Sequence, residues 1–262
     1  MNNFNYHKPA TPEEAAKLLS GGAKALAGGM TLLPTIKQGL ASPDALADLS
    51  ALSELTGIRE DDKRGLVIGA MTAHAEVAAS ALVRDRIPAL AALADGIGDA
   101  QVRNRGTVGG SLANNDPAAD YPAALLGLGG SVHTNKRGAI TADEFFTGLF
   151  STALEEDEII MHAHFDIPEK AAYLKFPQPA SRYALVGVFI AKTKNGARAA
   201  VTGAGENGVF RAKELEDALN KDFSAAALEG VQIPAAGLLG DIHGSPEYRA
   251  RLVSVLAKRA LS

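Results

Sequence analysis

The 262-residue sequence contains no cysteine and no tryptophan, and aromatic residues make up only 5% of it. A chain without cysteine forms no disulfide, offers no thiolate nucleophile and cannot hold an iron–sulfur cluster through its own thiolates. If the protein takes part in redox chemistry, an organic cofactor must therefore carry the electrons. The scarcity of aromatic side chains also gives no support for a dedicated aromatic substrate pocket.

Long hydrophobic runs are missing too. No apolar run reaches the roughly 18 residues that a membrane-spanning helix requires, and the first four residues do not open a signal peptide. The formal net charge of −4 argues against a nucleic-acid or anionic-membrane partner. His162 and His164 lie two residues apart on an expected strand, which is more typical of a packed or solvated pair than of a metal site. We expect a cytoplasmic protein with no metal site, no membrane span and no nucleic-acid partner.

Two glycine pairs are the most distinctive feature of the sequence. Gly28-Gly29 follows a short apolar run, with Thr31 as the expected N-cap of a helix over Leu32–Gln38. Gly109-Gly110 lies in the segment 105–120, among small residues and amides. Because glycine has no Cβ, a ligand can approach the backbone and its N–H groups, and a helix N-terminus favours an anion. Two such loops suit a ligand with two phosphates, although a single glycine pair is equally typical of an ordinary turn.

The glycine loops do not match the commoner nucleotide motifs, because the sequence has neither G-x-x-x-x-G-K-[ST] nor G-x-G-x-x-G in these loops. The pair AGGMTLLP, from Ala27, and NRGTVGGSLANNDPAADYP, from Asn104, instead resembles the flavin-binding subunit of the molybdenum hydroxylases. The xanthine dehydrogenase flavin domain and the medium subunit of aerobic carbon monoxide dehydrogenase belong to this family. The likeness extends over nearly the whole chain and is greater to the second of these.

The resemblance implies non-covalently bound FAD, with its pyrophosphate on the backbone of both loops. The expected cofactor contacts, carried over position by position, are Ala27, Gly28, Gly29, Met30, Thr31, Leu32, Leu33, Ile97, Thr107, Val108, Gly109, Gly110, Ser111, Asn114, Asp120, Ile160 and Lys175. The relatives most often have His at two of these positions, where this chain has Met30 and Asn114. The backbone contacts need no particular side chain there, so FAD binding is expected to survive this difference.

Four of these residues lie outside the loops. The resemblance places Asp120 on the hydroxyl-rich linker or ring of the flavin, Ile97 and Ile160 against the ring system, and Lys175 where its ammonium would favour the anionic reduced ring. Without the resemblance, the two isoleucines fit a hydrophobic core, Lys175 fits a solvated strand and Asp120 fits a helix start.

The hydrophobic patterning divides the chain near Pro168. Before this residue strands and helices alternate. After it, Ala184–Lys192 and Ala197–Gly203 are expected strands, joined through Asn195-Gly196, which is a strong hairpin signal. The expected fold is therefore α+β. By resemblance it is PCMH-like, with residues 1–168 as an FAD-binding domain of two α/β subdomains split near 55–65, and residues 169–262 as a small α+β domain with a three-stranded antiparallel sheet and helices.

The expected function is that of the FAD-binding, electron-transfer subunit of a molybdenum hydroxylase, an oxidoreductase. The resemblance implies a small partner subunit with two [2Fe–2S] clusters and a large subunit with the molybdenum cofactor, in a hetero-oligomer that is expected to be a dimer of heterotrimers. Electrons would pass from the clusters through FAD to an external acceptor, and no residue of this chain would act as a catalytic acid or base. Two alternatives are a self-sufficient flavin oxidase or reductase and a non-enzymatic flavin-binding module.

Overall fold

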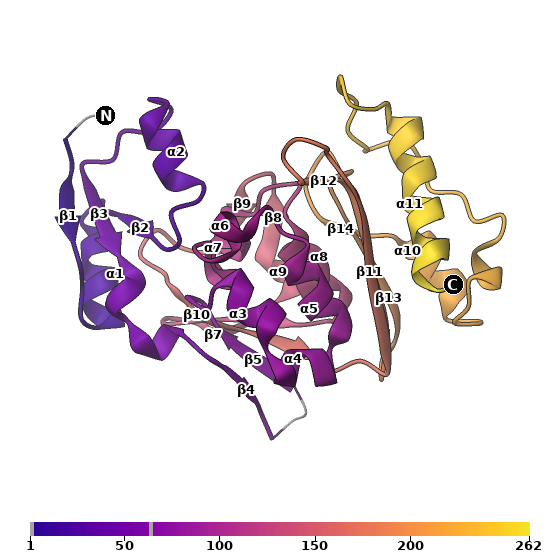
Figure 1. Ribbon diagram of the computed structural model, residues 1–262, viewed down its shortest axis with the longest axis horizontal. Coiled ribbons are helices and arrows are strands. Elements are labelled where there is room, and N and C mark those ends of the chain that lie inside the picture. Colours follow the sequence, from indigo (N-terminus) through magenta and orange to yellow (C-terminus); the bar gives the residue numbers. More distant parts are fainter. Residues whose placement is uncertain (1–2, 63–64) are drawn as a thin grey trace.

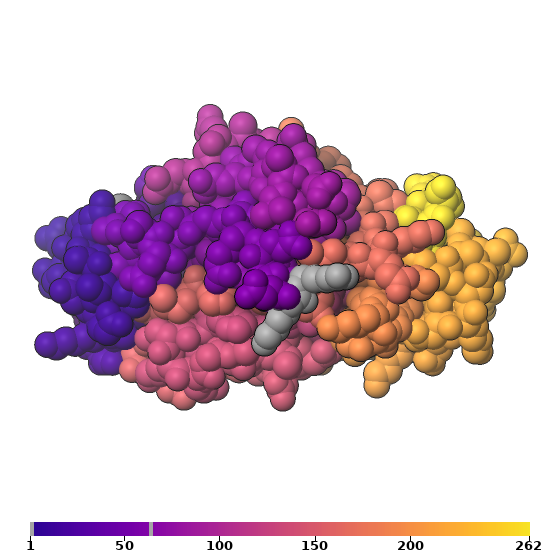
Figure 2. Space-filling view, turned by 90° about the horizontal axis from the view of Figure 1, so that it is seen from below, coloured from indigo at the N-terminus to yellow at the C-terminus, as the bar shows by residue number. Residues whose placement is uncertain are grey.

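The computed structural model describes residues 3–62 and 65–262. The three larger sheets follow one another along the long axis of the molecule, in the order of the sequence (Figure 1). The space-filling view shows the N-terminal residues at one end, the C-terminal residues at the other, and the broad middle part between them (Figure 2). None of the described helices is both long and apolar enough to cross a membrane.

The N-terminal sheet is parallel, with the strand order β1-β3-β2. Its strands are β1 (Asn5–His7), β2 (Lys24–Leu26) and β3 (Ala45–Asp48), and its helices are α1 (Pro12–Ser20) and α2 (Leu32–Lys37). At the start of helix α1 the Thr11 side chain accepts a hydrogen bond from the Glu14 N–H, and proline takes the first helical position. Its Ala15 and Leu19 side chains are buried in the same small core as Ala47 of β3.

The middle sheet has five strands in the order β4-β5-β10-β6-β7, and every neighbouring pair is antiparallel. The strands are β4 (Ile58–Glu60), β5 (Gly65–Gly69), β6 (Ser131–Thr134), β7 (Gly138–Thr141) and β10 (Ile160–Asp166). The expected α/β arrangement therefore holds for the N-terminal sheet only. The physical reason is that the short β4–β5 and β6–β7 connections can join antiparallel strands, whereas parallel strands need a longer crossover.

A layer of helices accompanies the middle sheet and encloses the largest hydrophobic core (Figure 1). The helices are α3 (His74–Ala79), α4 (Ala81–Arg86), α5 (Pro88–Asp95), α6 (Ala100–Arg103), α7 (Val108–Asn114), α8 (Asp120–Gly127) and α9 (Ala142–Phe145). A small hairpin, β8 (Phe146–Gly148) and β9 (Ser151–Thr152), follows α9. Short 3-10 turns occur at η1 (Leu49–Ala51), η2 (Ser53–Leu55) and η3 (Ala226–Leu228).

The C-terminal sheet is antiparallel with the order β11-β12-β13-β14. Its strands are β11 (Lys170–Pro177), β12 (Ala184–Thr193), β13 (Gly196–Thr202) and β14 (Phe210–Arg211). The predicted hairpin through Asn195-Gly196 is confirmed, since Thr193 pairs with Gly196 at the end of the β12–β13 ladder. The sheet has four strands rather than the expected three, because the two-residue β14 adds to the edge of β13 and is too short to show an alternating pattern.

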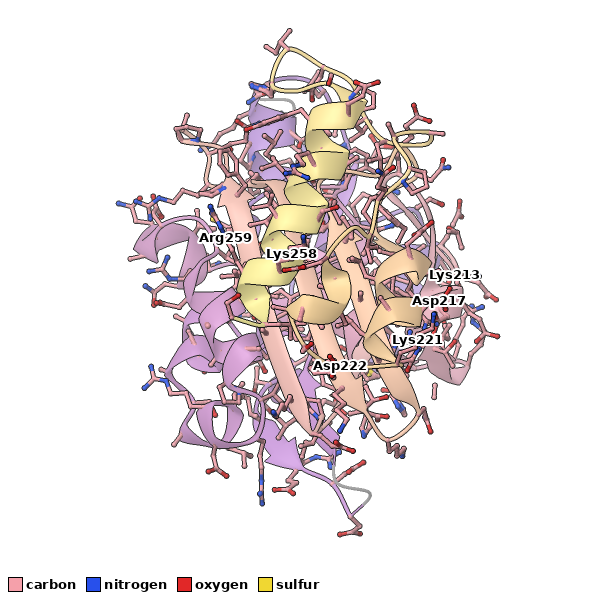
Figure 3. All side chains as sticks on the ribbon, turned by 90° about the vertical axis from the view of Figure 1, so that its right-hand side faces the viewer. Lys213, Asp217, Lys221, Asp222, Lys258 and Arg259 are labelled. Carbon is pink, nitrogen blue, oxygen red and sulfur yellow. The ribbon has the colours of Figure 1, made fainter. Side chains whose placement is uncertain are left out.

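Helices pack against both faces of this C-terminal sheet. Helix α11 (Pro246–Ala260) lies across one face, beside α10 (Lys213–Leu219) (Figure 3). Helices α5 and α8 of the middle part contact β11, β12 and β13. Phe189 of β12 accordingly belongs to the middle core and packs against Gly127 of α8. Pro168 lies between β10 and β11, and the division of the chain into domains at this residue stays a prediction.

Candidate functional site

The first glycine loop connects β2 to α2. Gly29 has a positive φ of 76°, a conformation that favours glycine, and its carbonyl accepts from the Leu33 N–H. Thr31 holds the N-cap position of α2, but its side chain makes no capping hydrogen bond and its backbone is already helical. The expected side-chain cap is therefore wrong at Thr31, and the start of α2 is left without a side-chain acceptor for its N–H groups.

Five successive backbone N–H groups in this loop are free of protein acceptors. From Gly28 to Leu32, none donates a hydrogen bond to any residue that the structure describes. Gly28 and Gly29 are also buried. Buried N–H groups nearly always have an acceptor, because leaving one unpaired costs free energy comparable to a lost hydrogen bond. This loop can therefore accept an external ligand with several hydrogen-bond acceptors, such as a phosphate.

The second glycine pair lies inside the first turn of α7 rather than in an open loop. The Val108 and Gly109 N–H groups donate to the carbonyls of Thr72, at 3.1 Å, and Ala70, at 2.8 Å. The Gly110 N–H donates to the Thr107 hydroxyl at 3.1 Å, which caps the helix. These N–H groups already have acceptors, so the geometry differs from the expectation that this backbone receives a pyrophosphate.

The second loop instead offers free polar side chains. Ser111 and Asn114 are half-buried, and neither side chain hydrogen-bonds to any residue in the described ranges. They lie three residues apart on α7, and residues at this spacing share one helix face. Ser111 and Asn114 can therefore contact the same ligand.

The two glycine loops meet directly. A Cβ at Gly28 would lie 2.0 Å from the Arg105 carbonyl oxygen, so only glycine allows the two backbones this approach. A Cβ at Gly110 would lie 2.8 Å from the Thr107 hydroxyl and 3.4 Å from the Ala27 side chain. The structure thus brings together two of the predicted regions, which are separated by most of the N-terminal half of the sequence.

Asp120, Lys175 and Tyr173 form a second group. The Lys175 ammonium donates to both carboxylate oxygens of Asp120, at 3.0 and 3.1 Å, and the Tyr173 hydroxyl donates to one of them. The side chains of Asp120 and Lys175 are only 5% and 10% exposed. Burial raises the pKa of Asp120, while Lys175 and Tyr173 oppose that rise. Lys175 is therefore not a solvated strand lysine, and the Asp120 side chain is occupied by these two residues rather than by a helix cap.

The two predicted isoleucines have different surroundings. Ile97, just after α5, is half-buried and packs against the middle core. Its neighbour Gly96 lies beside the Lys175 side chain, since a Cβ on Gly96 would be 3.9 Å from Lys175 Cε. Ile160 is 5% exposed in the core, and its environment fits the alternative of a core residue.

Comparison with known proteins identifies the family to which this chain belongs. The family described as the FAD binding domain in molybdopterin dehydrogenase matches residues 2–169. The chain belongs to this family. It is 34% identical to the carbon monoxide dehydrogenase medium chain of Hydrogenophaga pseudoflava, over 99% of this chain and 96% of that one. It is 35% identical to the nicotine 6-hydroxylase medium subunit of Paenarthrobacter nicotinovorans, over 98% and 96% of the two chains.

Solved structures agree with these relatives. A carbon monoxide dehydrogenase from H. pseudoflava superposes with a TM-score of 0.87 at 34% identity, covering 99% of this chain and 96% of that one. Quinoline 2-oxidoreductase from Pseudomonas putida 86 gives a TM-score of 0.87 at 29% identity, with the same coverage. The predicted family, the FAD cofactor and the oxidoreductase class are thereby confirmed.

The sequence does not predict three residues of this FAD-binding protein as site residues. Tyr173 could have been found, because alternation along β11 puts it on the same face as Lys175. Arg103 gave no such signal, and His74, in a helix of small residues, is expected from the sequence to be structural. His74 donates its backbone N–H to the Gly106 carbonyl, and its buried ring lies against Gly106. Burial and the nearby Arg103 lower the pKa of His74 to about 4, so the ring is neutral at pH 7 and supports the second loop without charge.

Proposed function

We propose that this chain binds one FAD non-covalently and passes electrons from a partner subunit to an external acceptor. The observation that carries the proposal is the first loop, which is buried at Gly28 and Gly29 and has five unpaired N–H groups that suit the pyrophosphate of FAD. When bound, FAD supplies the redox chemistry, because it accepts electrons singly and passes them on in pairs.

The chain's own residues hold and orient the cofactor. Gly28 to Leu32 donate to the pyrophosphate, and the free side chains of Ser111 and Asn114 contact the same ligand from α7. Asp120 and Lys175 face the flavin end. Their mutual ion pair favours the ionised carboxylate, against the burial that raises the pKa of Asp120. We further propose that residues 1–168 form the FAD-binding domain, with two subdomains that divide near 55–65, and that residues 169–262 form the second domain.

The proposed partners are a small subunit with two [2Fe–2S] clusters and a large subunit with the molybdenum cofactor, in a cytoplasmic complex. Two features support this division of labour. The relatives are named medium chains or medium subunits, and this chain has no cysteine to ligate a cluster. Among the described residues, no group of three or more His, Cys, Asp or Glu side chains could hold a metal ion. We assign no catalytic acid or base to this chain.

Anaerobic reduction tests the electron-transfer role. The FAD-loaded chain is mixed with reducing substrates of molybdenum hydroxylases, alone and then with the iron–sulfur and molybdenum subunits. We expect the flavin absorbance to bleach only when both partners are present. Photoreduction of the isolated chain is the control that its flavin can be reduced at all. Rapid bleaching of the isolated chain by a small organic substrate would contradict the proposal and favour a self-sufficient oxidase.

A further inference from the structure

Arg182 has an unusual backbone conformation. It lies in the β11–β12 hairpin with a φ of 61°, a region that side chains with a Cβ rarely adopt. The hairpin fixes this conformation, because the Arg182 N–H donates to the Gln178 carbonyl at 2.8 Å and the Gln178 N–H donates to the Tyr183 carbonyl at 2.8 Å. Strained residues that the surrounding structure holds in place are common at ligand sites.

The Arg182 guanidinium meets a second guanidinium at one carbonyl oxygen. Arg182 Nη1 donates to the Gly98 carbonyl at 3.0 Å, and Arg103 Nη1 donates to the same oxygen at 3.2 Å. Arg103 also donates to the Ile97 carbonyl at 3.0 Å. The two positive groups are therefore immediate neighbours, held by carbonyl oxygens that carry no full negative charge.

Among the described residues, the only ion-pair partner of either arginine is an exposed aspartate beside Arg103. No carboxylate lies within ion-pair distance of Arg182 in the parts of the chain that the structure describes. Arg103 Nε forms an ion pair with Asp95 Oδ1 at 3.7 Å, and the Asp95 side chain is 74% exposed to solvent. Two adjacent cations without a buried anion repel each other, so an external anion would bind favourably between them.

These arginines lie at the rim of the Asp120–Lys175 pair. Gly96, two residues before Gly98, lies beside Lys175. Tyr183, next to Arg182 in the chain, is close enough to Asp120 for that carboxylate to raise its pKa, after burial and Asp116. Lys175 itself is neutralised by Asp120 at 3.0 Å. Among the described residues at this rim, Arg182 has no ion-pair partner and Arg103 is paired only with the exposed Asp95.

We propose that Arg182 and Arg103 form a binding site for an anionic group of the external electron acceptor, at the edge of the flavin site. The chemical class is an acceptor with an oxyanion or a comparable negative charge, which guanidinium groups bind through charge-assisted hydrogen bonds. This inference rests on the proposed function, because it places the acceptor beside the flavin that Asp120 and Lys175 face. It further specifies that the acceptor carries a negative charge, which the proposed function does not state.

The test uses two inorganic acceptors of opposite charge. The full chain with FAD is photoreduced without oxygen and mixed with ferricyanide, an anion, or hexaammineruthenium(III), a cation. Each acceptor ion takes one electron, so two ions reoxidise one fully reduced flavin and its protons go to solvent. For Arg182→Gln we expect the ferricyanide rate to fall about tenfold at low salt, with a weaker salt dependence. The hexaammineruthenium rate should stay the same or rise.

A matched control removes the same charge elsewhere. Arg259 is exposed on α11, on the far face of the C-terminal sheet (Figure 3), and Arg259→Gln should leave both rates unchanged. Arg182→Lys keeps the charge and should retain most of the ferricyanide rate. Arg182→Gly removes the charge and relieves the positive φ, so it serves as the second variant if Arg182→Gln folds poorly.

The outcomes separate the two proposals. Equal loss with both acceptors, no loss with ferricyanide, or an equal loss in Arg259→Gln would overturn the arginine site. A wild-type chain that binds no FAD would instead overturn the proposed function, before any acceptor is tested.

Discussion

Gly28→Ala is expected to yield a chain that carries no flavin. The added methyl group would lie 2.0 Å from the Arg105 carbonyl oxygen and 2.9 Å from the Gly106 Cα, both parts of the backbone. No side-chain rotation can relieve such a contact, so the two glycine loops must separate and the N–H groups of the first loop lose their arrangement. Overpacking of this kind costs about 3 kcal/mol of folding stability.

Two glycine-to-alanine substitutions with smaller expected effects serve as comparisons for Gly28→Ala. Gly110→Ala would place its methyl group 2.8 Å from the Thr107 hydroxyl, so it should weaken FAD binding less than Gly28→Ala. Gly21→Ala, with its nearest contact at 3.3 Å from the Leu18 carbonyl, should retain full flavin. For each of the three variants, the FAD content per chain measures cofactor binding and urea unfolding measures stability. Full flavin occupancy in Gly28→Ala would show that the contact between the loops does not shape the site.

Lys175→Met should be the second severe variant. It leaves the Asp120 carboxylate buried, and among the described side chains only the Tyr173 hydroxyl then hydrogen-bonds to it. Removing one member of a buried ion pair costs about 3–5 kcal/mol, since the remaining charge is uncompensated. The double variant Asp120→Asn with Lys175→Met has no buried charge at this position and should recover most of the stability. It should still bind FAD poorly, if the pair faces the flavin.

The pH dependence of Lys175→Met follows from the same burial. Burial already raises the pKa of Asp120 above its ordinary 3.8, and removal of Lys175 takes away the largest opposing influence. The folded protein then holds the proton more tightly than the unfolded chain, so stability falls as the pH rises from 3.8 toward the raised folded-state value. Lys175→Met should therefore lose less stability relative to wild type at pH 5 than at pH 7, as urea unfolding at the two pH values would measure. An equal loss at both would mean that Asp120 is not the destabilising charge.

The sequence predicts best those secondary-structure elements that neighbouring residues determine. Asn195-Gly196 predicts the β12–β13 hairpin, and the structure contains it. The short strand β14 left no signal, because two residues cannot show alternation. The surroundings of other residues depend on contacts with segments that are distant in the sequence. The Gly109 N–H donates to Ala70 and a Cβ there would lie 2.5 Å from the Ala70 side chain, so this glycine permits close packing rather than an open phosphate loop.

At the candidate site, too, the sequence does not reveal contacts between distant segments. The sequence marked both glycine loops as ligand sites, but it could not show that Gly28 touches the Arg105 backbone, because that contact joins distant segments. Asp120 and Lys175 were found through the resemblance, and their ion pair emerged only from the tertiary structure, in which a side chain at the start of α8 reaches one on β11. Arg103 of α6 and Arg182 of the β11–β12 hairpin meet at the Gly98 carbonyl, in the turn before α6. No local pattern encodes that meeting.

The most direct test is the flavin content of the purified chain. The protein is precipitated with acid, and the flavin in the supernatant is identified and counted per chain. We predict that all of the yellow colour is released as FAD, close to one per chain, because the chain has no cysteine for a thioether link and the first loop offers its N–H groups to a pyrophosphate. Colour retained on the precipitate, release of FMN instead of FAD, or a chain that takes up no flavin when FAD is added would contradict the account.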